Sequence, residues 1–137
     1  MCIHLAATLS AVALTTGMLL AAPPAGAGAH TSSYPISEFD VTVGNTYTRG
    51  TITWYDRSVT VAGEQKSVSS ASCRQTTAFA LASANKQLGY AVTPGIACGE
   101  SEKFSFSAGA PVPGGAAVVR ICLDDGSKPL RCERYGR

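Results

Sequence analysis

Residues 114–132 read GGAAVVRICLDDGSKPLRC, and this stretch decides the expected fold of the chain. Apolar side chains recur there at every second position: Ala117, Val119, Ile121 and Leu123, with Val118, Arg120 and Cys122 between them. A two-residue repeat of this kind is typical of a strand with one buried face. The Asp-Gly-Ser sequence at 125–127 favours a turn, because Gly tolerates positive φ and Asp can hydrogen-bond within its own turn.

A chain reversal near Ser127 places Cys122 opposite Cys132. Cross-strand neighbours satisfy the Cα separation of about 4.4–6.8 Å that a disulfide needs. The stretch therefore predicts a C-terminal hairpin that is closed by a disulfide.

The first 29 residues predict an export signal. Residues 3–22 are apolar and free of formal charge, and Ala27-Gly28-Ala29 fits the small-residue rule of a signal-peptidase site. The residues before the apolar run lack the usual Lys or Arg. A retained transmembrane anchor is the alternative, since about 20 apolar residues can span a bilayer. The adjacent cleavage pattern favours export and removal of residues 1–29, which leaves a chain of ordinary single-domain size.

Four cysteines remain after this cleavage: Cys73, Cys98, Cys122 and Cys132. An even number of cysteines behind an export signal predicts two disulfides. Three connectivities exist, and we expect Cys73–Cys98 with Cys122–Cys132 because sequential pairing keeps each loop short. A zinc site is disfavoured, since the chain has no Cys-x-x-Cys pair and its only remaining histidine is His30. No metal or other cofactor is expected.

The rest of the chain indicates short strands. Residues 30–48 predict a lead-in with a first strand over Phe39–Val43, and residues 49–137 predict the main domain. Residues 50–61 predict one central strand in which the alternation changes phase, with a bulge or bend near 55–57. A turn is expected at 62–64 and a polar edge strand over 65–72.

Two interpretations stay open for residues 74–90. Alternation of Thr77, Phe79 and Leu81, with a turn at 84–86, favours a hairpin. Alternating alanines, together with Lys86 and Gly89 at the end of the segment, favour a helix instead. We expect the hairpin, because the flanking segments are β-like.

These elements, with Phe104 and Phe106 on the inward side of a further strand and a loop at 109–115, predict an all-β fold. The expected architecture is a small disulfide-stabilised β-sandwich, of which an immunoglobulin-like arrangement is one form. Residues 53–61, the Phe104-Ser-Phe106 strand and Gly114-Gly115 leading into Ile121-Cys122 resemble a group of small secreted actinobacterial proteins. That group is uncharacterised, Cys-paired and β-rich, so the resemblance implies export and fold but no activity.

Residues typical of catalysis are few. His4 belongs to the predicted signal and His30 to the new terminus, so a packed histidine base is missing. Ser83 and Lys86 match a Ser-x-x-Lys pattern without its partner motifs, and are interpreted as turn residues. Glu100 and Glu102 suggest a solvated strand start more than a glycosidase pair. Residues 124–126 suggest a turn more than a calcium loop, and no catalytic residues are assigned.

Trp54 is expected in the core, and Tyr55 on the opposite face. Tyr55 with Arg57 then forms a candidate binding site, because aromatic and Arg side chains are enriched at binding hot spots. The alternative without a binding role is that Tyr55 packs beneath the aliphatic part of the Arg57 side chain.

The sequence thus favours a secreted, extracellular, non-catalytic binding or interaction module. Its expected partner is an extracellular protein or cell-wall material, and a monomer is expected. The net charge of +2 is too small to indicate nucleic acid or an acidic membrane. A secreted protease inhibitor is the alternative, with its reactive loop at 111–115 or 124–129. A small secreted hydrolase is the second alternative and is disfavoured by the missing histidine.

Overall fold

The structure is a computed structural model and describes residues 33–137. The predicted signal over 1–29 and His30 lie outside these residues. Eight strands form the domain: β1 (Ile36–Val43), β2 (Thr46–Trp54), β3 (Ser58–Lys66), β4 (Gln75–Leu81), β5 (Gln87–Val92), β6 (Ser101–Gly109), β7 (Val118–Asp125) and β8 (Lys128–Gly136). Within the described part, no helix has the length and apolar character needed to cross a membrane.

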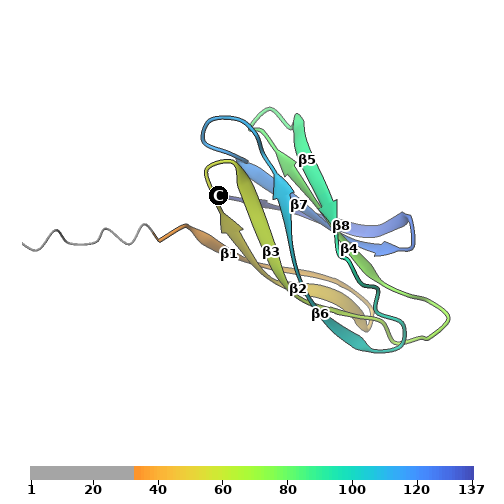
Figure 1. The fold of residues 1–137 in the computed structure, drawn as a ribbon. Helices are drawn as coiled ribbons and strands as arrows, with labels where there is room; N and C mark the ends of the chain where they lie inside the picture. Colours follow the sequence, from red (N-terminus) through yellow and green to blue (C-terminus); the bar gives the residue numbers. More distant parts are fainter. Residues whose placement is uncertain (1–32) are drawn as a thin grey trace, which may run out of the picture. The chain divides into compact units, whose positions relative to one another are not determined.

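The strands form two four-stranded antiparallel sheets (Figure 1). Sheet 1 has the order β1-β2-β3-β6, and sheet 2 has the order β5-β4-β7-β8. The inner faces of the two sheets form one apolar core, so the predicted all-β sandwich is confirmed. The orders β2-β3-β6 and β5-β4-β7-β8 are those of the A-B-E and C′-C-F-G strands of immunoglobulin-like sandwiches, with β1 as an additional edge strand.

The C-terminal hairpin forms as the alternation predicts. Val119, Ile121 and Leu123 are fully buried on β7, and Cys122 lies opposite Cys132 on β8. Gly126, at φ +60°, takes the first place of the two-residue loop between the strands. That conformation strains a side-chain-bearing residue but not Gly.

Residues 74–90 form a hairpin and not a helix. β4 pairs with β5 on one side and with β7 on the other, so its alanines lie in a sheet interior. The turn is closed at Asn85, whose φ of +64° is one that Asn tolerates better than most residues. Packing between strands therefore overrides the helix propensity of the alanines here.

The prediction of one central strand over residues 50–61 was wrong. The chain reverses between Trp54 and Val59, and the amide N–H of Tyr55 donates to the carbonyl of Ser58 at 2.9 Å. The change of phase is thus a hairpin turn, which allows Trp54 and Val59 both to be fully buried. The indole N–H of Trp54 donates to the hydroxyl of Ser37 at 2.9 Å, so the predicted core position of Trp54 is confirmed.

The predictions of a turn at 62–64 and of a polar edge strand at 65–72 were also wrong. Gly63 lies in the middle of β3, opposite Gly50 on β2. A Cβ atom on Gly63 would lie 2.0 Å from the carbonyl oxygen of Arg49, so this close strand approach requires Gly. Gln65 ends the buried face of β3, fully buried, and its amide donates to the carbonyl of Gly95 at 3.0 Å.

The two open sides of the sandwich are closed in different ways. At the β1–β8 side, the hydroxyl of Tyr135 donates to the carbonyl of Asp40 at 3.0 Å and accepts from its amide at 3.1 Å. At the β5–β6 side, the backbone of Gly89 lies directly against the backbone of Gly109. A Cβ atom on Gly89 would lie 2.2 Å from the carbonyl oxygen of Gly109, so this contact requires Gly. Both contacts cover strand edges that would otherwise be open to pairing.

The structure joins Cys73 to Cys98 and Cys122 to Cys132, the pairing expected from the sequence. The first bridge ties the residues before β4 to those before β6, and the second joins β7 to β8. Each closes a short loop, of 25 and 10 residues in sequence separation. By the chain-entropy model each bridge stabilises the domain by about 3 kcal/mol.

Candidate functional site

The candidate binding residues Tyr55 and Arg57 lie in the β2–β3 turn, at one end of sheet 1. The ring of Tyr55 packs against Tyr34 with centroids 4.5 Å apart, and Arg57 is exposed. The carbonyl of Arg57 accepts a hydrogen bond from the amide of Ala110. The two residues thus share one turn, but neither lines the two hollows described below.

Other residues considered for chemistry lie apart from one another. Ser83 and Lys86 lie in the β4–β5 turn, whereas Glu102 lies on β6. The part of the chain that the structure describes holds no group of three or more metal-ligating side chains that could bind an ion. Of the two loops considered for protease inhibition, 111–115 is held in a turn by hydrogen bonds from the amide of Val112 to the carbonyl of Ala110 and from the amide of Gly115 to the carbonyl of Val112. The other is the tight β7–β8 turn, and the inhibitor function stays a prediction.

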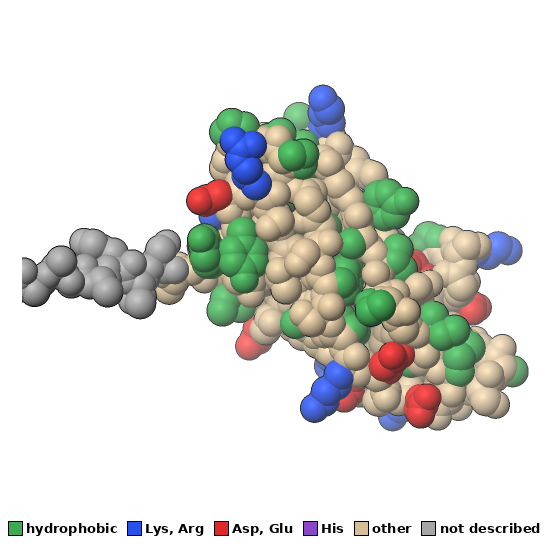
Figure 2. Space-filling model, in the orientation of Figure 1, with side chains coloured by type: hydrophobic (Ala, Val, Ile, Leu, Met, Phe, Trp, Pro, Cys, Tyr) green, Lys and Arg blue, Asp and Glu red, His purple; other side chains and the backbone are tan. Residues whose placement is uncertain are grey.

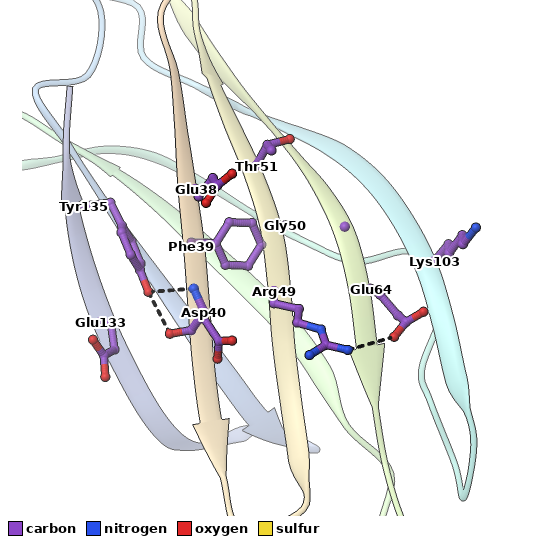
Figure 3. Close-up of a pocket in the computed structure, with 11 residues that line it drawn as sticks. Glu38, Phe39, Asp40, Arg49, Gly50, Thr51, Glu64, Lys103, Glu133 and Tyr135 are labelled. Atoms are coloured by element: carbon purple, nitrogen blue, oxygen red, sulfur yellow. Dashed lines mark hydrogen bonds and ion pairs between the residues drawn. The ribbon is translucent and has the colours of Figure 1, made fainter.

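The outer face of sheet 1 carries a broad open hollow of about 960 Å³ (Figure 3). Four carboxylates surround it, together with two cationic side chains: Glu38, Asp40, Glu64, Glu133, Arg49 and Lys103. Arg49 lies 3.9 Å from Glu64 and 3.9 Å above the ring of Tyr47, whose hydroxyl donates to Glu64. Within the described residues, Arg49 and Glu64 are the one pair among these six groups that lies within ion-pair distance.

The outer face of sheet 2 carries a smaller and more enclosed hollow of about 420 Å³, a size typical of ligand sites. Its lining comes from all four strands of the sheet and from the β7–β8 turn. The sheet register explains why, since side chains at every second position of β4 and β7 point to this face. We call this hollow the sheet 2 site.

One row of side chains crosses the sheet 2 site from β5 to β7. Tyr90 lies opposite Phe79, and Phe79 lies opposite Arg120. The rings of Tyr90 and Phe79 are stacked at 6.0 Å with an interplanar angle of 25°, and the guanidinium of Arg120 lies 4.3 Å above the ring of Phe79. Tyr90 is 61% exposed, so the row presents an aromatic face to solvent beside a cation.

Asp124 lies at the other end of the sheet 2 site and is buried. Its carboxylate accepts a hydrogen bond from the hydroxyl of Thr77 at 2.5 Å. Burial raises the pKa of Asp124, and the Thr77 hydrogen bond opposes part of that rise. Asp124 forms no ion pair with Arg120.

The Cys122–Cys132 disulfide forms part of the wall between the aromatic row and Asp124. Cys122 is buried, whereas Cys132 faces solvent on β8. The bridge therefore fixes the register of the two strands that carry this end of the site.

The face of the molecule in Figure 2 does not single out another region. On the face shown in Figure 2, acidic and basic side chains are scattered, and hydrophobic side chains lie singly or in small groups. This distribution agrees with the small net charge of +2. A large field of one sign, as nucleic acid would require, is not visible on that face.

Comparison with protein-family models, with curated proteins and with solved structures finds no match to this chain.

Sequence reasoning missed Phe79, Tyr90 and Arg120 as candidate site residues. A partial signal existed, because the alternation in residues 117–123 already placed Arg120 on the outward face with Cys122. Phe79 and Tyr90 gave no such signal, since their pairing depends on the β4–β5 turn.

Proposed function

We propose that this protein is a secreted, non-catalytic binding module and that it binds a saccharide of extracellular or cell-wall material through the sheet 2 site. The observation that carries the proposal is the exposed face of Tyr90, backed by the stacked ring of Phe79. An exposed aromatic ring supported from behind offers a flat apolar surface at low entropic cost. The C–H groups on one face of a sugar ring match such a surface.

Polar groups around the ring pair support a ligand rich in hydroxyls. Gln75 and Arg120 line the same hollow, where the side-chain carbonyl of Gln75 offers an acceptor and the guanidinium of Arg120 offers donors. An aromatic platform with a few polar groups around it is the usual composition of a small-molecule site.

Export is part of the proposal. Two disulfides indicate an oxidising compartment, and they support the export signal predicted over residues 1–29. Origin among the small secreted actinobacterial proteins belongs to the same proposal and rests on the resemblance of short motifs.

The test is co-sedimentation of the folded domain, residues 30–137, with purified insoluble bacterial cell walls. We expect the wild type to sediment with the walls, and Tyr90→Ala to bind about tenfold or more weakly, taking the stacking of a nucleobase on one aromatic ring, about 1–3 kcal/mol, as the guide. Ile96→Ala is the control, because Ile96 is another exposed apolar side chain, at 53%, and lies outside the sheet 2 site.

Equal binding by the wild type and Tyr90→Ala would refute the sheet 2 site, and absence of wild-type binding would refute the function. The pair of variants Tyr55→Ala and Arg57→Ala tests the candidate site in the β2–β3 turn with the same assay. A loss confined to that pair would move the binding site to this turn.

A further inference from the structure

We infer that the bound saccharide carries a carboxylate group, which the guanidinium of Arg120 binds while Tyr90 supports a sugar ring. The inference rests on the proposed function and names the chemical class of its ligand.

The first reason for this inference is that the guanidinium of Arg120 lacks a partner in the described part of the chain. Within the described residues its guanidinium forms no ion pair and no hydrogen bond, and its Nε atom is buried without a partner. The stacking on Phe79 holds the group in place but leaves its N–H donors unused. A buried donor without a partner is costly, so a site of this kind is completed by a ligand acceptor.

The contrast with other arginines of the domain strengthens this point. The Nε of Arg74 is also buried without a partner, but the Nη1 of Arg74 lies 3.2 Å from Asp125. Arg131 lies 2.5 Å from Glu133. Arg134, next to Arg120 in the same row of sheet 2, donates to the side chain of Asn85. Arg120 thus lines a hollow, and its guanidinium N–H groups pair with no acidic side chain of the described residues.

The charge of the surroundings is the second reason. Asp124 is the acid that lines the sheet 2 site, and its carboxylate is engaged by Thr77. Arg134 lies opposite Arg120 on β8 and adds a second positive charge on this face. The end of the site near Arg120 is therefore cationic, and it complements an anionic group.

The positions of Arg120 and Tyr90 set the geometry of the ligand's carboxylate and sugar ring. A planar guanidinium forms two parallel hydrogen bonds with a carboxylate, which a neutral hydroxyl cannot reproduce. Tyr90 and Arg120 lie on strands either side of β4, a separation of about 10 Å across the sheet. Because Phe79 lies between the two side chains, a ligand of more than one sugar unit can contact both, with one ring on the exposed face of Tyr90 and a carboxylate-bearing unit on Arg120.

The test uses the same cell walls, before and after chemical reduction of their carboxyl groups to alcohols. We expect the wild type to bind the reduced walls about tenfold or more weakly, since a hydrogen bond to a charged group is worth about 1.5–3 kcal/mol. Arg120→Gln binds both preparations with equal, low affinity, whereas Arg120→Lys keeps part of the preference. Arg49→Gln, on sheet 1, is the matched control and keeps the full preference.

Two soluble competitors distinguish the source of the carboxylate. Oligogalacturonate carries it on a sugar, and a glutamate-containing peptide carries it on amino acids. We expect competition by oligogalacturonate and not by the peptide. Competition by the peptide alone would overturn the saccharide part of the inference.

The outcomes separate this inference from the proposed function. Equal binding of intact and reduced walls by the wild type would overturn the carboxylate while leaving the binding function in place. Binding to neither preparation would remove the function itself. The wild-type comparison does not depend on a variant, so a misfolded Arg120→Gln protein would not leave the inference untested.

Discussion

At the scale of a single residue, Asp124 shows how burial on the outer face of sheet 2 changes the pKa of a carboxyl group. The residue is 7% exposed, with one hydrogen bond from Thr77 and no ion pair within the described chain. Desolvation disfavours its charged form, so burial raises the pKa of Asp124 above the ordinary value of 3.8. The folded protein therefore holds this proton to a higher pH than the unfolded chain does.

The sign of the resulting pH dependence is set by that difference. Between pH 3.8 and the raised folded-state pKa of Asp124, the folded state binds more protons than the unfolded state, so stability falls as pH rises. We expect Asp124→Asn to remove this fall, since the amide oxygen can still accept from Thr77. Urea unfolding at a series of pH values gives the free energy of unfolding of the wild type and of Asp124→Asn. The difference between these two free energies measures the contribution of Asp124 at each pH.

The exposed Asp56→Asn, in the β2–β3 turn, is the control for replacing a carboxyl group by an amide. If the stability of Asp124→Asn relative to the wild type increased as the pH fell, the expected sign would be wrong.

At the scale of the element, β1 shows how an edge strand is protected. It pairs with β2 on one side only, and its other edge faces β8. Tyr135 reaches across and replaces a strand partner at Asp40, with one donated and one accepted hydrogen bond. Its ring also contacts Phe39 edge-on at 6.1 Å, so one side chain links both edge strands.

Removal of this hydroxyl tests the link. We expect Tyr135→Phe to lower the free energy of unfolding by about 1–3 kcal/mol, because a backbone donor and acceptor lose their partner. The control is Tyr90→Phe, whose hydroxyl has no hydrogen bond within the described residues and whose loss should leave stability nearly unchanged. Chemical denaturation of the two variants gives both values, and equal stabilities would show that the hydroxyl of Tyr135 does not hold the edge.

Above pH 10 the same group opposes stability. Burial raises the pKa of Tyr135, and the hydrogen bond with the backbone of Asp40 opposes part of that rise. The net direction is upward, so the folded state keeps the phenol proton to a higher pH than the unfolded chain does. Stability therefore falls as the pH rises beyond the ordinary value of 10.0.

At the scale of the whole molecule, the sandwich depends on a close contact between its sheets at the β5–β6 side. Gly89 of sheet 2 lies against the backbone of Gly109 in sheet 1, and the opposite side is held by Tyr135. Between these two sides lies a core of small and medium residues around Trp54. The separation of the sheets is thus set at both sides as well as by the core.

A methyl group at this contact tests its importance. A Cβ atom on Gly89 would lie 2.2 Å from a backbone oxygen, which cannot move cheaply. We expect Gly89→Ala to destabilise the domain by about 1–3 kcal/mol, the usual cost of overpacking. Gly109→Ala is the matched control, because its Cβ would meet no atom within 4 Å.

Thermal unfolding of the two variants distinguishes them. A melting temperature of Gly89→Ala equal to that of Gly109→Ala would show that the sheets separate at this side without cost.

The sequence by itself determined the features that depend on local chemistry. Gly126 and Asn85 favour their turns because each tolerates positive φ, and alternation then assigns the buried face of β7. The pairing of the four cysteines followed from sequence spacing and from the register of one hairpin.

Only the tertiary structure decided the features that depend on long-range pairing. The β2–β3 reversal at residues 55–58 contains Asp56 and Ser58 but no Gly, Pro or Asn, so its sequence fits a bulge in a continuing strand as well as a turn. Gln65 looks like an edge residue until Gly95, 30 residues away, supplies a partner inside the fold. Tyr90, Phe79 and Arg120 form one site because three strands place them in a single row, and strand register is a property of the assembled sheet that no local pattern contains.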